Sequence, residues 1–219
     1  MRKMMLTSFS LVILSSAITA ARADDQKSAS LDYFPLRPLV KGKEGDWWKY
    51  ELGSGNTKSD FTMKVVKTQK QADKTDLFQI DTIMPERTIH SWFTKGNGVV
   101  LKQREQFGDD PQMMTQFQPA YVIKNTLKNG DKWEWSGKGQ MGVEAKESFQ
   151  VSGPETVVVP AGKFETMKLT DRVVQGKNIS VKTVWFANQV GMVKSSVQTD
   201  AGVTEVKLVD YAAKKKSSG

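Results

Sequence analysis

Polar and apolar side chains alternate along Asp60-Phe61-Thr62-Met63-Lys64-Val65, which places Phe61, Met63 and Val65 on one face of a strand. Residues 178–186 alternate in the same way. Turn sequences such as Asn129-Gly130-Asp131 separate such segments at short spacing. The one helix candidate, 119–127, is short. The pattern predicts further strands over 47–52, 77–84, 87–94, 98–106, 132–138, 143–152, 164–174, 191–198 and 202–210.

These strands predict an all-β protein built as an antiparallel meander. Strands at regular short spacing have to close on themselves or pair with a second sheet, because an open sheet leaves its edges unpaired. The chain has 219 residues, enough for one domain or two small ones with a sizeable core. The expected architecture is therefore barrel-like or a sandwich.

The composition excludes several classes of chemistry. The sequence has no Cys, which excludes disulfides, thiol catalysis, thiolate zinc sites and iron–sulfur clusters. A single His, His90, leaves little room for a multi-histidine metal centre. We therefore expect neither a metal nor a cofactor.

Residues 1–23 have the features of a secretory signal peptide. Arg2 and Lys3 form a positive start, an apolar run covers 6–14, and Ala21-Arg22-Ala23 is a small-x-small cleavage pattern. The apolar run is too short to cross a bilayer of about 30 Å. Cleavage would remove three of the 32 Lys and Arg, so the mature charge is 29 − 24 = +5. We expect export to the periplasm or beyond, and no transmembrane segment in the mature chain.

The basic residues do not indicate a nucleic-acid-binding protein. Lys and Arg are scattered singly along the predicted strands, as expected for solvated faces. The one run, Lys214-Lys215-Lys216, lies in a polar tail over 212–219 that is typical of a flexible terminus. An envelope lipid, glycan or protein is the expected kind of partner.

An internal repeat is the most specific feature of the sequence. Each half has a Trp-bearing opening strand and a closing strand with Trp followed by Phe. The order of the matches is kept and their offset drifts slowly, as duplication of one β unit would leave it. The matching pairs are 45–50 with 130–135 (offset 85), Phe61 with Phe149 (88), and 90–93 with 183–186 and 98–100 with 191–193 (both 93).

The repeat predicts the domain layout. A first β half covers 45–108 and a second covers 130–211, joined by a connecting segment over 109–129 and preceded by an extended N-terminal segment over 24–44. The two halves could share one barrel or form two lobes, and the sequence leaves both open.

Two parts of the sequence resemble the bacterial TapB-like exported domains. The start, Tyr33-Phe34-Pro35-Leu36-Arg37-Pro38 followed by Gly45-Asp46-x-Trp-x-Tyr, is similar to the start of that family. In the second half, Val159-Pro160-Ala161-Gly162-Lys163-Phe164 and the element from Trp185 to Val193 resemble its hairpin and closing motifs. Asn188 departs from the family pattern, where Pro is usual. The resemblance implies an exported all-β domain and transfers no catalytic residue.

Several of these motif residues have a structural explanation. We expect Asp46 and Asp131 to accept amide hydrogens of their own turns, and Pro160 to limit the strand before it. Gly162 is expected to adopt a left-handed conformation so that Phe164 can fold back onto the core. The GxGxxG pattern at 137–142 leads into an alternating strand instead of a helix, so it predicts a hairpin and no phosphate site.

The tryptophans are the features that could form a binding site. Trp47 and Trp48 are adjacent, so on a strand they face opposite sides. If a cavity lies between the halves, Trp92, Phe93, Trp185 and Phe186 are the predicted lining residues for an apolar ligand.

Three hypotheses for function follow. The first is a non-enzymatic envelope module that binds a ligand or partner, marked by an apolar cavity or an exposed Trp row. The second is a hydrolase with an unrecognised carboxylate site, which requires two acids, or an acid and His90, converging in a pocket. The third is a purely structural envelope protein with neither cavity nor exposed aromatics. No catalytic constellation is visible in the sequence, which favours the first.

Overall fold

The computed structural model describes residues 31–212 except 42, 55–56, 97, 139–142 and 200–201. The predicted signal peptide, the basic tail beyond Ala212 and most of the GxGxxG pattern lie outside the described residues. Within these residues, no helix is long and apolar enough to cross a membrane.

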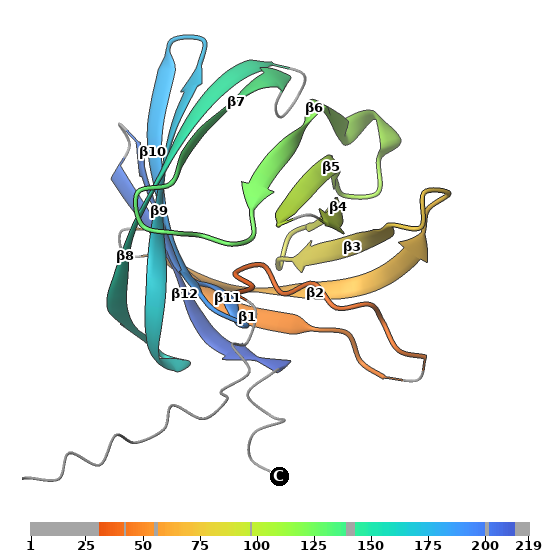
Figure 1. Cartoon of the computed structure of the whole chain (residues 1–219), viewed down its shortest axis with the longest axis horizontal. Helices are drawn as coiled ribbons and strands as arrows, with labels where there is room; N and C mark the ends of the chain where they lie inside the picture. Colours follow the sequence, from red (N-terminus) through yellow and green to blue (C-terminus); the bar gives the residue numbers. More distant parts are fainter. Residues whose placement is uncertain are drawn as a thin grey trace, which may run out of the picture. The chain divides into compact units, whose positions relative to one another are not determined.

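The described chain forms one closed antiparallel barrel, in which consecutive strands are neighbours and β12 pairs with β1 (Figure 1). A 3-10 turn, Pro111–Met113, precedes β6. The strands are β1 Trp47–Ser54, β2 Thr57–Lys70, β3 Asp76–Ile83, β4 Thr88–Gly96, β5 Val99–Phe107, β6 Met114–Lys124, β7 Lys132–Lys138, β8 Glu144–Val159, β9 Gly162–Gln175, β10 Asn178–Ala187, β11 Gly191–Thr199 and β12 Gly202–Tyr211.

The all-β prediction is confirmed, and both halves share a single barrel. The helix predicted over 119–127 is wrong. Residues 114–124 form β6, where Tyr121 and Ile123 pair with Lys102 and Val100 of β5. Pairing with a neighbouring strand outweighs a short helical pattern, because each paired residue satisfies its backbone groups. The predicted connecting segment over 109–129 therefore contributes a strand to the barrel.

The repeat corresponds to two sets of six strands, β1–β6 and β7–β12. A bulge interrupts the β4–β5 ladder between Trp92 and Phe93, and another interrupts the β10–β11 ladder between Trp185 and Phe186. One expected match is out of register. Tyr50 pairs with Phe61, but Trp135, which matches Tyr50, pairs with Glu147. The position equivalent to Phe61 is therefore Glu147, two residues before Phe149.

Two apolar clusters lie inside the barrel, and neither is confined to one half. Trp48, Tyr50 and Phe61 belong to the first, and the Tyr50 and Phe61 rings stack with their centroids 5.1 Å apart. Trp135 and Phe149 belong to the second. The outward positions of the same strands are mostly polar, so alternation alone directs these aromatic side chains inward.

The barrel has one weakly paired seam, between β6 and β7. Gln118 and Lys138 are the single residue pair that joins these strands in the described structure. Two indole N–H groups of β7 reach across it. Trp133 Nε1 donates to the Val122 carbonyl at 3.3 Å, and Trp135 Nε1 donates to the Pro119 carbonyl at 3.2 Å. Side-chain hydrogen bonds thus take over part of the role of the missing ladder.

Candidate functional site

The barrel encloses a cavity of about 460 Å³. This volume lies within the range of about 300–1,000 Å³ that is usual for small-molecule sites. Most of its lining is aromatic or aliphatic, and both halves contribute. The aromatic lining residues are Phe34, Trp48, Tyr50, Phe93, Phe117, Tyr121, Trp133, Phe149 and Phe186.

The structure separates the four predicted lining residues into two pairs. Phe93 and Phe186 are buried and line the cavity. Trp92 and Trp185 do not line it, and that part of the prediction is corrected. Adjacent residues on a strand face opposite sides of the sheet, so each Trp-Phe pair can send only one ring inward.

Trp92 and Trp185 lie on the outer face and contact cationic side chains there. The Arg104 guanidinium lies 4.3 Å from the Trp92 ring centroid, and Lys194 Nζ lies 5.1 Å from that of Trp185. Trp185 Nε1 also donates a hydrogen bond to Glu155. The repeated Trp therefore has a structural role on the outer face, where a cationic side chain from the neighbouring strand stacks on its ring.

Two other tryptophans line the cavity instead. Trp48 is buried, lines the cavity and donates from Nε1 to the Val190 carbonyl at 2.6 Å. Trp133 matches Trp48 in the repeat and also lines the cavity. Trp47 is half-buried and does not line the cavity, as expected for the neighbour of Trp48. The repeat offset of 85 residues was the signal that could have identified this pair.

The N-terminal segment 31–39 closes one end of the barrel. Phe34, Pro35 and Leu36 line the cavity, and Tyr33 and Leu36 are buried. We call residues 33–36 the plug. The end of β4 and the loops between β6 and β7 and between β10 and β11 lie around this end, since Lys95, Asn125 and Asn188 bind the segment.

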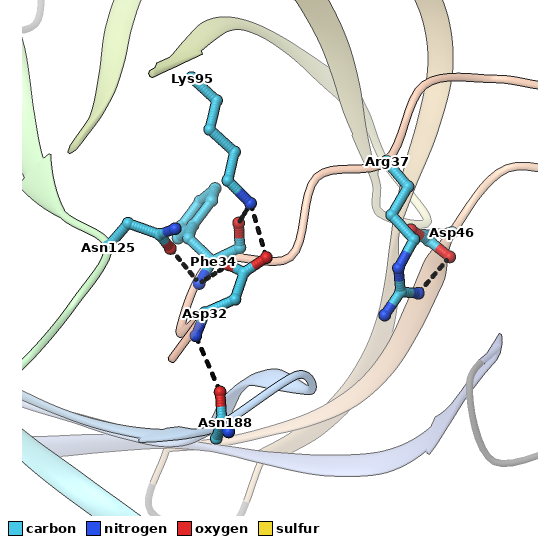
Figure 2. A network of polar contacts seen from close by, with 7 residues as sticks. All are labelled: Asp32, Phe34, Arg37, Asp46, Lys95, Asn125 and Asn188. Atoms are coloured by element: carbon cyan, nitrogen blue, oxygen red, sulfur yellow. Dashed lines mark hydrogen bonds and ion pairs between the residues drawn. The ribbon is translucent and has the colours of Figure 1, made fainter. Parts of the chain in front are cut away.

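Polar contacts hold the N-terminal segment to β4 and to two loops (Figure 2). Lys95 Nζ donates to Asp32 Oδ2 at 2.7 Å and to the Phe34 carbonyl at 3.1 Å. Asn125 Oδ1 accepts the Phe34 amide at 2.8 Å, and Asn188 Oδ1 accepts the Asp32 amide at 2.8 Å. Because several backbone groups of the segment are paired, it is an ordered part of the barrel.

Polar side chains interrupt the apolar lining, and five of them form what we call the polar corner. They come from β5, β6, β8, β9 and β10, and all line the cavity. Tyr121 Oη donates to Glu147 Oε2 at 2.6 Å. The members of the polar corner are Lys102, Tyr121, Glu147, Asp171 and Lys182.

Asp171 is the most buried member of the polar corner, with 4% of its surface exposed. Burial raises the pKa of its carboxyl to about 8, the Glu147 charge and a hydrogen bond to Glu147 add to the rise, and Lys182 opposes it. Its Oδ1 atom has no hydrogen-bond partner. A buried acceptor without a donor is costly, so this atom is available to a ligand.

Lys102 is the second buried charge. Burial lowers the pKa of its ammonium to about 7, the Lys182 charge adds to this, and the Glu147 charge opposes it. Lys102 also forms an ion pair with the buried Glu105, and its Nζ lies 5.2 Å from the Phe117 ring centroid. The Glu105 carboxylate favours the charged form of Lys102.

Sequence reasoning did not identify the polar corner, although a signal was present. Glu147 lies between Ala145 and Phe149 on β8, and both of these neighbours face inward. A charged residue at an inward position of an alternating strand is the pattern to search for, because burying a charge requires a partner or a pKa shift. Asp171 shows the same pattern beside Leu169, whereas Lys182, beside Val184, lines the cavity but is exposed.

The predicted turn residues differ in what their side chains do. Asp131 Oδ2 accepts the Lys128 amide of its own turn at 3.2 Å. Asp46 does not act in this way: its Oδ1 accepts from Arg37 Nη1 at 3.1 Å, because the plug segment lies beside it. That expectation for Asp46 is corrected.

The hairpin around Pro160 brings β8 and β9 together. Gly162 has φ = 143°, within the region that favours glycine. Phe164 is half-buried and packs with its centroid 6.1 Å from that of Tyr211. Pro160 occupies the turn between the last residue of β8 and the first of β9.

His90 lies away from the cavity. It shares the outer face of β4 with Trp92, and its Nδ1 lies 2.8 Å from Asp81 Oδ1. The described residues contain no group of three or more His, Asp or Glu side chains that could hold a metal ion.

No protein-family model matches this chain, and a search of curated proteins found no match. Three solved structures are similar to it. A candidate exported protein with a YmcC-like fold from Bacteroides fragilis is 15% identical, with a TM-score of 0.49 over 83% of this chain and 99% of that one. A candidate lipoprotein from Parabacteroides distasonis is 12% identical, with a TM-score of 0.47 over 83% and 99%.

The third structure is the hypothetical lipoprotein YmcC from Escherichia coli, 11% identical, with a TM-score of 0.40 over 77% of this chain and 85% of that one. All three neighbours are described as exported proteins or lipoproteins. None is described as TapB-like, so that resemblance stays a prediction. At these TM-scores the similarities carry no argument about the function of this chain.

Proposed function

We propose that this protein binds an apolar or amphipathic small molecule inside its barrel and acts after export, in the bacterial envelope. The observation that carries the proposal is the cavity of about 460 Å³, lined by aromatic and aliphatic side chains from both halves. Empty apolar space of this size is costly to maintain, because its lining loses packing contacts. A ligand would restore them.

The plug supports the same proposal. Phe34 and Leu36 shield one end of the cavity from water, while Lys95, Asn125 and Asn188 hold the segment in place. Because the plug closes this end of the barrel, a bound molecule has to enter the cavity at another point. The pattern of residues 1–23 supports export, and the scattered charges favour a soluble barrel exterior.

The test is native mass spectrometry of the protein purified from the periplasm of a producing bacterium. We expect an adduct of lipid-like mass that dissociates on unfolding. Titration with the neutral fluorophore N-phenyl-1-naphthylamine gives an independent measurement, because Trp48 and Trp133 line the cavity and report on its occupation. Failure of both measurements would contradict the proposal.

Filling the cavity provides a matched control. Ala145 of β8 is buried and lines the cavity, so Ala145→Phe removes space for the fluorophore and weakens its binding at least about tenfold. Ser148 is exposed on the outer face of the same strand. Ser148→Phe introduces the same side chain there, and fluorophore binding should not change.

A hydrolase is the second candidate, favoured by one observation. Glu147 and Asp171 converge in the cavity, which satisfies the requirement for two acids in a pocket. Incubation with chromogenic esters and glycosides tests it. Turnover that Asp171→Asn abolishes would favour the hydrolase, whereas adduct binding without turnover supports the binding protein. The presence of a cavity argues against a purely structural protein.

A further inference from the structure

We infer that the polar corner binds the uncharged hydroxyl head group of an amphiphile whose apolar chain lies in the rest of the cavity. The inference rests on the proposed function and adds the chemical class of the ligand. It depends on one unpaired acceptor, on the balance of charges around it, and on where these groups lie in the cavity.

The unpaired acceptor is Asp171 Oδ1. Asp171 is only 4% exposed and lines the cavity, and its Oδ1 atom has no hydrogen-bond partner. Tyr121 cannot supply the donor, because its hydroxyl already donates to Glu147. A ligand hydroxyl can donate to Oδ1 and can accept from a neighbouring donor at the same time.

The charges that face Asp171 favour a neutral head group. Lys102 is ion-paired with Glu105, and the remaining charges are Lys182 and Glu147, one of each sign. Asp171 is mostly protonated at neutral pH, because burial and Glu147 raise its pKa. The sum is zero. A carboxylate brought into this corner would meet the like charge of Glu147 as well as Lys182, and an ammonium would meet Lys182 as well as Glu147. Either ion would therefore lose hydration without a net electrostatic gain.

The position of the polar corner suits an amphiphile. Glu147 is the fourth residue of β8, and Lys182, which pairs with Asp171, is the fifth of β10. Both strands begin at the barrel end opposite the plug. The plug end of the cavity is lined by Phe34, Pro35 and Leu36. A single-chain molecule can therefore lie with its head at the polar corner and its chain directed toward the plug.

Three probes with the same ten-carbon chain test the inference: decan-1-ol, decanoate and decylammonium. Each displaces N-phenyl-1-naphthylamine from the full-length mature protein at pH 7. We expect decan-1-ol to bind about tenfold more tightly than either ion, the effect of pairing one buried acceptor. Equal affinity for all three overturns this inference alone, and tighter binding of an ion assigns the corner to that charge instead.

Asp171→Leu removes the acceptor and places a branched apolar side chain at the same position. We expect decan-1-ol to lose about tenfold in affinity. Asp60→Leu, on the outer face of β2, is the control and leaves decan-1-ol binding unchanged. If Asp171→Leu does not fold, as judged by circular dichroism, Asp171→Ala replaces it: it removes the same acceptor without adding bulk, and the same loss of affinity is expected.

The outcomes separate the two proposals. If neither the fluorophore nor any ten-carbon probe binds the wild-type protein, the proposed function and this inference both fail. If the fluorophore binds and Asp171→Leu leaves the affinity for decan-1-ol unchanged, the inference fails and the proposed function stands.

Discussion

The two halves of the barrel repeat one strand plan but differ in what they place inside it. The ladders make Phe61, Thr82 and Ile89 of the first half equivalent to Glu147, Asp171 and Lys182 of the second. The first set is uncharged and the second consists of ionisable groups. A duplicated sheet therefore keeps its hydrogen-bonding register while its inward positions change, because strand pairing depends on the backbone and cavity chemistry on side chains.

The halves also differ in how their opening strands are held. Trp48 and Tyr50 of β1 donate to the Val190 and Met192 carbonyls, while β1 pairs with β12 from Trp48 to Ser54. The equivalent Trp133 and Trp135 of β7 donate to β6, with which β7 shares a single residue pair. The same aromatic positions lie beside a long ladder in one half and bridge a nearly unpaired seam in the other.

The strongest test of this difference moves a charge into the first half. Phe61→Glu creates at that position the carboxylate that its equivalent, Glu147, already carries. We expect the free energy of unfolding to fall by about 4 kcal/mol or more, since Phe61 packs among apolar side chains and its ring stacks on Tyr50. Urea unfolding measures the loss. Phe61→Leu is the control, with a loss of roughly 1–2 kcal/mol; similar losses for both would contradict the difference between the halves.

The pH dependence of stability should originate in the second half. Asp171 has a folded pKa of about 8 and an ordinary value of 3.8, so between these values the folded protein holds a proton that the unfolded chain has lost, and stability falls as pH rises. For Lys102, with a folded pKa of about 7 against 10.5, the unfolded chain holds the extra proton, and stability rises with pH over that window.

The free energy of unfolding should therefore be lowest between pH 7 and 8. It should rise toward lower pH (the acidic limb) and toward higher pH (the alkaline limb), each by an amount on the order of a few kcal/mol. Urea unfolding at pH 5, 7.5 and 10 measures both limbs. Asp171→Asn should abolish the acidic limb and leave the alkaline one. An unchanged acidic limb in that variant would assign the titration to another group.

A smaller effect should follow from neutralising Glu147. Its charge contributes to the raised pKa of Asp171, so Glu147→Gln lowers that pKa and moves the acidic limb to lower pH. The change in stability at pH 7 should be within about 2 kcal/mol. Carboxyl carbon NMR of Asp171 follows its titration directly. Glu144→Gln, an exposed position on the same strand, should leave the Asp171 titration where it is.

The smallest expected effect concerns the seam. Trp133→Phe removes one donor to the Val122 carbonyl, and Trp48→Phe removes the equivalent donor to Val190, each at a cost of about 1 kcal/mol. Their local consequences should differ. Amide hydrogen exchange should accelerate in β6 and β7 for Trp133→Phe, while β1 and β12 stay protected in Trp48→Phe. Faster exchange at β1 in the second variant would show that both halves depend equally on their indoles.

Much of the fold could be predicted from residues alone. Alternation identified most strands, since inward and outward environments differ in polarity at every second residue. It failed over 119–127, where pairing with β5 decides the conformation. For the site, the repeat correctly predicts that Phe93 and Phe186 line the cavity. It wrongly includes their neighbours Trp92 and Trp185, because adjacent residues of one strand cannot both face inward.

The sequence by itself determined the strand period, the turns, the duplication and the absence of thiol chemistry, because all of these depend on local spacing or composition. Only the tertiary structure decided that the halves share one closed barrel, that residues 33–36 plug one end, and that Lys102, Glu147 and Asp171 meet inside it. Those three side chains come from strands far apart in the chain. Their burial, and with it the raised pKa of Asp171, exists only once the barrel has closed and excluded water.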